Sequence, residues 1–529
     1  MKPMLTRILA VFLCLCFLCP IFLTVEVQAY NRKPAPVKEE NDPNDPDAAQ
    51  NISDAKLVTE HQGFHNIFHL FNRGEQGERR TKENAMLTLA HSEGIGYLYF
   101  SFGAEHGTYT ITNNDTGVTV TAGEHGFLYE LADLTELFGA APSSVTVHFT
   151  GGPVLINELT VFTEGYLPKY VQVWEPAREG ATDLILFSTH GDDEQLFFAG
   201  ILPYYCALDY EVLVVYMVDH SERQPYRLKE MLNGLWAVGV TTYPVFGPYS
   251  DFFVQSLNRA YTVFERQGVT RDDIIEFVLT QLRTYKPKVV VGHDFDGEYG
   301  HGQHMAYADC LAAALDISND PDQYPELAEA YGTWAVPKAY FHLYEENPIV
   351  MDWDTPMEEL DGYTPFEMTQ LFGFPHHVSQ QKNWMSNWIN GGKYKIKNAS
   401  QIEDYNPCYY GLYNSTVGPD VKKNDFFENV LSHAQQAQKE EEQRLAEEAR
   451  LAEEARLAEE ARLAEEARLA EEARLAEEAR LAEEARLAEE ARLAEEAAAR
   501  MKQTLILVAA AVLLLVLAVM ILRWVRHRK

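Results

Sequence analysis

The chain has 529 residues, of which 46% are hydrophobic and 12% aromatic, and its formal net charge at pH 7 is −35. This length is too great for a single hydrophobic core, so we expect two or more domains. The strong negative charge argues against binding to nucleic acid or to anionic lipid through bulk charge, because a phosphate backbone would be repelled.

The N-terminus has the pattern of a signal peptide over residues 1–29. Basic residues precede an apolar run from Ile8 to about Leu23, and Val27 and Ala29 fit a signal peptidase site after Ala29. The alternative is an uncleaved N-terminal anchor, which the proline inside the apolar run disfavours. The sequence therefore predicts secretion of the segment that follows.

The next two segments differ sharply in composition. Residues 30–55 are rich in Pro, Asp, Glu and Asn, which predicts a disordered linker. Residues 56–165 contain short alternating strands separated by turn residues, such as Gly96–Phe102 and Ser144–Phe149. This texture predicts a β-sandwich accessory domain. Such a domain either holds glycan or only packs on its neighbour, and the sequence leaves both open.

Residues 166–345 alternate between strand and helix patterns, which predicts a Rossmann-like α/β domain with a mainly parallel sheet. The expected strands are Leu184–Ser188, Val212–Val218 and Lys288–Gly292, and the expected helices are Gln195–Ala207, Pro225–Val238 and Asp272–Tyr285. Residues 346–433 are aromatic and lack clear periodicity, so we expect them to form an extension that wraps over this domain.

Residues 434–500 are expected to form one long helix. Nine RLAEEA units run from Arg444 to Ala497, and no Gly or Pro interrupts them. A six-residue repeat turns successive Leu residues to three sides of a helix, so a coiled coil is disfavoured. Arg and Glu recur at ion-pair spacing instead. These 67 residues would form a rigid stalk roughly 100 Å long.

The C-terminus has the pattern of a membrane anchor. Residues 504–522 are uninterrupted and apolar, long enough to span a bilayer. The tail at 523–529 is basic, which predicts a cytoplasmic C-terminus. The localisation that follows is the cell membrane, as a single-pass protein whose segment between the two apolar ends is extracellular.

Two clusters of polar residues follow buried strands of the α/β domain. The first is Thr189-His190-Gly191-Asp192-Asp193-Glu194, and the second runs from Gly292 to His304 and includes His293, Glu298 and His301. In open α/β sheets ligands bind beyond the carboxyl ends of strands, so both clusters are well placed. His and carboxylate side chains are suitable zinc ligands, and a neighbouring carboxylate can handle protons.

These clusters resemble the two motifs of the LmbE/PIG-L family of zinc-dependent N-deacetylases, His-Pro-Asp-Asp-Glu and Gly-His-Pro-Asp-His. The resemblance covers roughly residues 180–345. It implies that His190, Asp193 and His304 bind Zn2+, that Asp192 is the general base, and that His301 stabilises the oxyanion or assists protonation. Family substrates are N-acetylated amino sugars.

The sequence departs from the family pattern at three positions. Gly191 and Gly302 replace prolines, which would loosen both loops without removing a ligand. Gln303 replaces the acidic residue between the two histidines, which would weaken the proton chemistry of His301 if that carboxylate tunes it. His293 and Glu298 are expected to orient the metal loop rather than to bind metal.

Other polar residues support weaker predictions. Arg227 is a candidate substrate ligand for a sugar or phosphate, but it could equally pair with Glu230 on the helix surface. Asp251 is a second candidate substrate ligand, or an ordinary turn residue. The adjacent pair His376–His377 is expected to be a poor pair of metal ligands, because neighbouring side chains point in different directions, and both are expected to be ordinary polar or core histidines.

The sequence as a whole predicts a zinc-dependent hydrolase at the cell surface that removes N-acetyl groups from N-acetylglucosamine-type sugars. Its partners would be an N-acetylated glycan or glycoconjugate and the membrane, and no nucleic acid. One alternative is a catalytically weak or inactive surface protein that binds glycan. The other is a zinc amidohydrolase that acts on a different amide.

Overall fold

The computed structural model describes residues 41–528 except 43, 72–78, 222, 382–388 and 390–395. The expected signal peptide at 1–29, and the part of the expected linker at 30–40, lie outside the described residues. The chain divides after Gln436 into two compact units. The first contains a β-rich region and the α/β domain, and the second contains most of one long helix.

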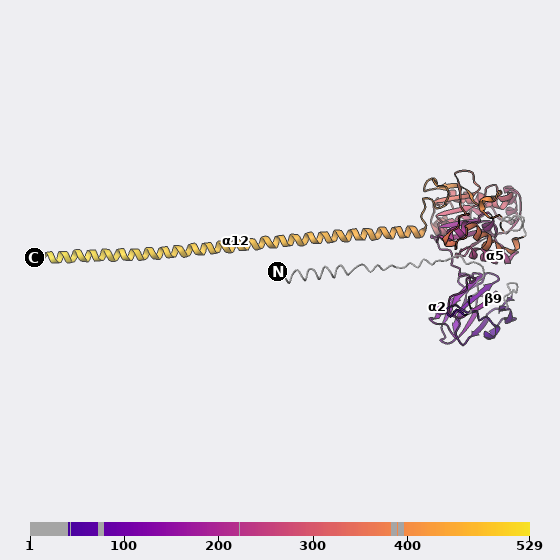
Figure 1. Ribbon diagram of the computed structural model, residues 1–529, viewed down its shortest axis with the longest axis horizontal. Coiled ribbons are helices and arrows are strands. Elements are labelled where there is room, and N and C mark those ends of the chain that lie inside the picture. The colour runs from indigo at the N-terminus through magenta and orange to yellow at the C-terminus, as the bar shows by residue number, and fades with distance from the viewer. Residues whose placement is uncertain are drawn as a thin grey trace. The chain divides into compact units, whose positions relative to one another are not determined.

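The β-rich region consists of two antiparallel sheets (Figure 1). Their strands, in spatial order, are β1 (Val58–Gln62), β3 (Ala85–Ala90), β8 (Ser144–Phe149), β5 (Tyr109–Asn113) and β6 (Thr119–Ala122) in one sheet, and β2 (Arg79–Arg80), β9 (Leu155–Phe162), β4 (Tyr97–Phe102) and β7 (Tyr129–Asp133) in the other. A short helix, α2 (Leu134–Phe138), follows β7. Phe100 joins the two sheets, since its ring contacts those of Tyr109 and Phe149 at centroid distances of 5.7 and 6.1 Å.

The expected disorder is wrong for the described part of the linker up to residue 55. The backbone N–H of Ala49 donates to the Tyr166 carbonyl at 2.9 Å, and that of Ile52 donates to the Val161 carbonyl at 2.9 Å. The strand β2 pairs only with the first residues of β9, Leu155 and Ile156. The segment around Asn51 pairs with the end of β9 instead, at Phe162. The polar composition of the segment suggested disorder. Backbone hydrogen bonds and the burial of Ala48 and Ala49 hold it in place instead.

The α/β domain is built on a seven-stranded sheet. In spatial order its strands are β12 (Val245–Tyr249), β11 (Val212–Val218), β10 (Leu184–Ser188), β13 (Val289–Gly292), β14 (Lys338–His342), β16 (Tyr409–Ser415) and β15 (Pro348–Val350). The first five are parallel to one another. The order reverses between β10 and β13, and such a switch point is where open α/β sheets bind ligands.

Helices cover both faces of this sheet, which explains why its central strands are buried throughout. The helices of the domain are α3 (Asp193–Leu196), α4 (Ile201–Ala207), α5 (Pro225–Ala237), α6 (Leu257–Arg266), α7 (Arg271–Tyr285), α8 (Gly302–Ile317), α9 (Pro325–Tyr331) and α10 (Pro365–Met368). Alternate residues of β10 and β11 pack with α4 and α5 on one face and with α6, α7 and α8 on the other.

Two expectations about this domain need correction. The helix expected over Gln195–Ala207 is interrupted, because Gly200 adopts a φ of 94° and separates α3 from α4. A side chain at Gly200 would lie 2.5 Å from the Trp353 ring, so close packing requires glycine there. The segment 346–433 does not only wrap over the domain, since β15 and β16 complete its sheet as an antiparallel edge.

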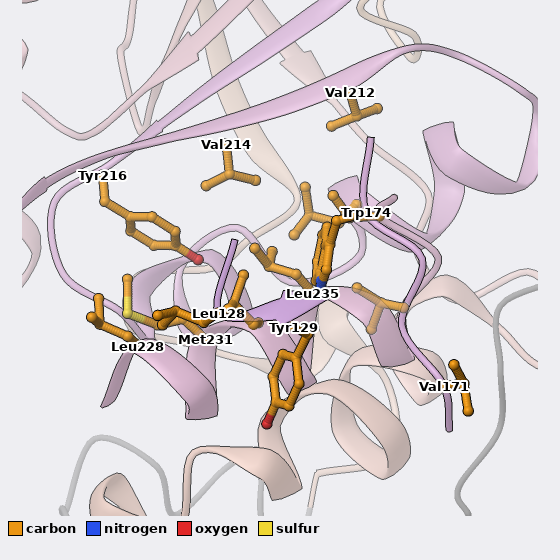
Figure 2. Close-up of a cluster of buried hydrophobic side chains, with 14 of the residues drawn as sticks. Leu128, Tyr129, Val171, Trp174, Val212, Val214, Tyr216, Leu228, Met231 and Leu235 are labelled. Atoms are coloured by element: carbon orange, nitrogen blue, oxygen red, sulfur yellow. The ribbon is translucent and has the colours of Figure 1, made fainter. Parts of the chain in front are cut away.

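The β-rich region packs directly on the α/β domain through α5 (Figure 2). Leu128 and Tyr129 belong to the same buried cluster as residues of α5 and β11. At this boundary the Lys229 ammonium donates to the Ser101 hydroxyl at 2.6 Å. The backbone N–H of Leu128 donates to the Tyr243 hydroxyl at 3.2 Å. The two parts of this unit therefore share one core.

The helix α12 (His433–Arg526) runs through 94 residues without a break. Each repeat Arg contacts a Glu three residues before it and another four residues after it, as Arg450 does with Glu447 at 2.6 Å and Glu454 at 3.1 Å. The repeat Leu side chains are half-exposed. Within the described residues, α12 is the one helix long and apolar enough to cross a membrane, and its most apolar window has a mean hydropathy of 3.4.

Candidate metal centre

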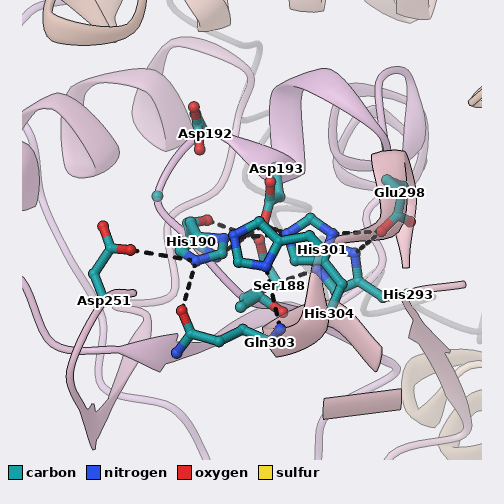
Figure 3. A network of polar contacts seen from close by, with 12 residues as sticks. Ser188, His190, Asp192, Asp193, Asp251, His293, Glu298, His301, Gln303 and His304 are labelled. Atoms are coloured by element: carbon teal, nitrogen blue, oxygen red, sulfur yellow. Dashed lines mark hydrogen bonds and ion pairs between the residues drawn. The ribbon is translucent and has the colours of Figure 1, made fainter. Parts of the chain in front are cut away.

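The polar residues singled out in the sequence converge at the carboxyl ends of the parallel strands (Figure 3). His190, Asp192 and Asp193 follow β10, and His293 follows β13, on the two sides of the switch point. His301 and His304 arrive from the start of α8. Two motifs about a hundred residues apart thus form one site, as their positions after buried strands predicted.

Three donor atoms form a nearly equilateral triangle in this site. Asp193 Oδ2 lies 3.2 Å from both His190 Nδ1 and His304 Nε2, and these two nitrogens are also 3.2 Å apart. Ligands of a tetrahedral zinc ion, with bonds of about 2.0–2.2 Å, stand about 3.3–3.6 Å apart. All three side chains are buried. The residues predicted to bind metal therefore lie close enough together to hold a metal ion between them.

The buried carboxylate of Glu298 holds several histidines at once. Its Oε2 lies 2.8 Å from His293 Nδ1 and 2.6 Å from His304 Nδ1, and its Oε1 lies 2.7 Å from His342 Nδ1. Burial alone would raise the pKa of Glu298, but His293 and His304 hold it well below its usual range. The contact at Nδ1 of His304 leaves its Nε2 facing the triangle, an arrangement common among metal-binding histidines.

His293 is close enough to be considered as a ligand, because its nitrogens lie within 4.8 Å of donor atoms of Asp193 and His304. Its hydrogen bonds argue against this role. The backbone N–H of Thr189 can only donate, and it donates to His293 Nε2 at 3.0 Å. That bond occupies the lone pair of Nε2, and Nδ1 faces Glu298. His293 therefore contacts the first loop through Thr189, which supports the prediction that it orients this loop rather than binding metal.

Asp192 directly precedes Asp193 in the chain, and its buried carboxylate faces Arg227. Burial raises the pKa of Asp192 to about 6, although the Arg227 guanidinium opposes this rise. Arg227 is itself buried and lies 3.4 Å from Asp192 Oδ1 and 3.5 Å from Asp251 Oδ2. The alternative partner Glu230 instead accepts hydrogen bonds from Ser379. Arg227 and Asp251 thus both lie at the site.

His301 is held in one neutral form by the helix it precedes. The backbone N–H of Gln303 donates to His301 Nδ1 at 3.1 Å, so the ring proton is on Nε2. Burial lowers the pKa of His301, and the neighbouring His190 and His304 lower it further. A neutral ring with Nε2–H is a hydrogen-bond donor, which suits oxyanion stabilisation better than protonation of a leaving group.

Gly191 and Gly302 are closely surrounded by neighbouring residues. A Cβ atom on Gly191 would lie 2.3 Å from the Met231 sulfur, and one on Gly302 would lie 2.7 Å from the Ser256 carbonyl oxygen. Neighbouring residues have taken the space that a larger side chain would need. A side chain at either position would therefore require neighbouring atoms to move, and the expectation of looser loops stays a prediction.

Two histidines at the site were missed. His377 was expected to be an ordinary polar or core histidine, and it is fully buried, but its Nε2 lies 2.9 Å from Glu194 Oε1, a contact that the sequence did not indicate. His220 follows β11, and burial, aided by Arg227, lowers its pKa to about 3. The position after a buried strand could have identified His220. His377 comes from the segment 346–433, where no periodicity indicated its position.

The rim of the site is aromatic. Phe253 exposes 58% of its surface, and its ring stacks on that of Tyr299 at a centroid distance of 6.1 Å and an interplanar angle of 14°. Tyr299 adopts a left-handed φ of 48°, which is unfavourable for a residue with a large side chain. The rim therefore offers a flat apolar surface next to Asp251.

Two family models match parts of this chain. A PIG-L family model described as GlcNAc-PI de-N-acetylase matches residues 185–315, and a model described as CG45076 coiled-coil matches residues 427–509. The 1D-myo-inositol 2-acetamido-2-deoxy-alpha-D-glucopyranoside deacetylase 2 of Saccharopolyspora erythraea is 33% identical over 116 residues, which cover 21% of this chain and 40% of that protein. The corresponding deacetylase of Streptomyces avermitilis is 21% identical over 295 residues, covering 47% of this chain and 97% of that protein.

A solved structure of N,N'-diacetylchitobiose deacetylase from Pyrococcus horikoshii aligns with 39% of this chain and 74% of its own, at 16% identity and a TM-score of 0.27.

Proposed function

The chain carries a PIG-L/LmbE family domain, and from this premise we propose that it is a metal-dependent hydrolase that removes N-acetyl groups from N-acetylglucosamine-type sugars. The observation that carries the proposal is the buried triangle of His190, Asp193 and His304 donor atoms, together with the buried carboxylate of Asp192, the residue before Asp193. Metal ligands and a separate carboxylate base are the two components that metal-assisted amide hydrolysis needs.

His190, Asp193 and His304 would hold zinc. Bound there, zinc would lower the pKa of a water molecule and polarise the acetamide carbonyl. Two histidines and one carboxylate are the number and kind of protein ligands that catalytic zinc sites use. Glu298 supports the centre by orienting His304, and His293 supports it by orienting the loop that carries His190.

Asp192 would act as the general base and then as the general acid. It takes a proton from the attacking water while the water oxygen bonds to the acetamide carbon. Arg227 favours the ionised carboxylate before this step. His301 donates its Nε2–H to the oxyanion of the tetrahedral intermediate. Asp192 then protonates the leaving nitrogen as the C–N bond breaks, which releases acetate and a free amino sugar.

The rim of the site supports a sugar substrate. Arg227 and Asp251 offer charged hydrogen-bonding groups, and their mutual contact at 3.5 Å orients both. Phe253 offers an exposed ring against which the apolar face of a sugar can pack. Polar groups combined with an aromatic surface are the usual composition of a small-molecule site.

The location of the enzyme is part of the proposal. The apolar segment 504–522 would cross the cell membrane, and the basic tail would remain in the cytoplasm. The α/β domain and the β-rich region would then be extracellular, and the repeat helix between them and the membrane would act as a stalk. Zinc and an extracellular N-acetylated glycan or glycoconjugate would be the partners.

Acetate release from chitooligosaccharides and N-acetylglucosamine glycosides tests the proposed reaction. The full chain in detergent would be assayed with zinc, after chelation, and as Asp192→Asn. We expect release to require zinc and to fall about 10²- to 10⁴-fold in Asp192→Asn. Asp272→Asn is the matched control and should retain full activity, because Asp272 is an exposed carboxylate at the start of α7.

The same assay distinguishes the two alternatives. Release of a different acyl group, with the same dependence on Asp192, would identify an amidohydrolase with another substrate. Tight zinc binding without release from any amide tested would contradict the enzyme and support a glycan-binding protein.

A further inference from the structure

The side chain of Gln303 is fixed by two backbone groups. Its Nε2 donates to the Ser250 carbonyl at 3.0 Å, and its Oε1 accepts from the backbone N–H of Phe252 at 3.0 Å. A carbonyl can only accept and an amide N–H can only donate, so the amide has one permitted orientation. Gln303 is fully buried, and water therefore offers no substitute for these partners.

This orientation determines which nitrogen of His190 carries the proton. The same Oε1 atom of Gln303 lies 3.2 Å from His190 Nε2. Because an amide oxygen can only accept a hydrogen bond, Nε2 must carry hydrogen. In a neutral ring the other nitrogen, Nδ1, then has a free lone pair. His190 Nδ1 is the atom that lies 3.2 Å from both Asp193 Oδ2 and His304 Nε2.

Gln303 also fixes the loop that carries a candidate substrate ligand. Ser250 and Phe252 are the two neighbours of Asp251, and Gln303 bonds to the backbone of each. Asp251 Oδ1 lies 3.6 Å from His190 Nε2 (Figure 3). One amide thus connects the loop after β12 to a predicted metal ligand that follows β10.

We propose that Gln303 is a positioning residue that sets the tautomer of His190 for metal binding and holds the Asp251 loop against the metal centre. The proposal rests on the metal site of the proposed function. It also revises the expectation about this position, because the side chain of Gln303 contacts His190 and only its backbone N–H contacts His301.

The amide offers a combination that a carboxylate lacks. An acidic residue at this position could accept from His190 and Phe252, but it has no donor for the Ser250 carbonyl. Glutamine provides both the acceptor and the donor without adding negative charge to the buried site. Replacement of Gln303 by Leu should therefore affect both the tautomer of His190 and the position of the Asp251 loop. Replacement by Glu should affect only the position of the loop.

Zinc affinity of the full chain in detergent tests the proposal, measured by competition with a chromophoric chelator. We expect Gln303→Leu to weaken zinc binding about 10- to 100-fold, the usual cost of losing a group that orients a metal ligand. Gln303→Glu keeps the acceptor and should bind zinc at least as tightly as the wild type. Gln281→Leu is the matched control, since its buried amide on α7 donates to the Phe277 carbonyl.

Cobalt substitution provides a second readout, because its visible absorption reports the geometry of the bound metal. We expect Gln303→Glu to retain the wild-type spectrum and Gln303→Leu to change it. Equal zinc affinity in wild type and Gln303→Leu would overturn the role of Gln303 and leave the metal site intact. Weak binding in a folded Gln303→Glu would also overturn it. Absence of zinc binding in the wild type would overturn both proposals.

Discussion

The candidate metal centre and the repeat helix α12 both bring polar, titratable side chains together, but they do so in opposite ways. In α12 every Arg–Glu contact joins residues three or four apart, and all of these side chains are exposed. In the metal centre His190 meets His304 across 114 residues, and both are buried. Exposed local ion pairs are screened by water, so each contributes little to stability. Removing one member of a buried polar network costs much more stability, because its partners are left buried without a hydrogen-bond partner.

This difference predicts the largest effect on folding at Glu298. Glu298→Gln removes the charge that faces three histidine rings, leaving them in a buried site without their carboxylate. Breaking a buried ionic contact by removing one partner costs about 3–5 kcal/mol. We expect the free energy of unfolding of the first unit to fall by about this amount, measured by urea denaturation of the full chain.

Glu329→Gln serves as the control for that measurement, because Glu329 is exposed on α9. It should leave the unfolding transition unchanged. Equal stability of Glu298→Gln and the wild type would contradict the importance of the buried network.

A smaller loss of stability is expected from Gly191→Ala, because Gly191 lies in a closely packed part of the centre. Gly191→Ala places a methyl group 2.3 Å from the Met231 sulfur, and such overpacking costs about 1–3 kcal/mol. If that clash causes the loss of stability, Met231→Ala should remove it in the double mutant. Met231→Ala alone is also destabilising, because it leaves a cavity. A double-mutant cycle measured by urea denaturation should show a favourable coupling between the two changes. Strict additivity would show that Gly191 matters for another reason.

The smallest effect is expected in the repeat helix. Arg450→Gln removes contacts with Glu447 and Glu454, but eight identical units remain and every partner is hydrated. We expect no detectable change in the helical signal at 222 nm or in the unfolding of the first unit. A cooperative loss of helicity after this one change would contradict the view that each repeat contributes independently.

The same contrast explains what the sequence could predict. The strands Leu184–Ser188 and Val212–Val218 were predicted with their observed bounds, because continuous apolar runs indicate buried strands. The helix of the repeats was equally evident, since propensity and spacing are local properties. The two metal motifs were located because each directly follows a buried strand.

Contacts that depend on tertiary structure were not predictable in this way. Nothing near His377 indicates that it would reach Glu194, and the sequence around Tyr409 does not show that β16 would join the main sheet. The side chain of Gln303 lies against His190, although proximity in sequence suggested His301. The N-terminal segment near Ala48 was misjudged because its backbone pairing with Tyr166 is likewise non-local.

The most direct test of the metal centre is the metal content of the purified full chain, determined by elemental analysis after dialysis against zinc and removal of unbound metal. The account predicts one zinc ion per wild-type chain and none in Asp193→Ala, because Asp193 provides one corner of the donor triangle. Asp272→Asn should retain its zinc. Stoichiometric zinc in Asp193→Ala, or none in the wild type, would contradict the assignment of His190, Asp193 and His304 as the metal ligands.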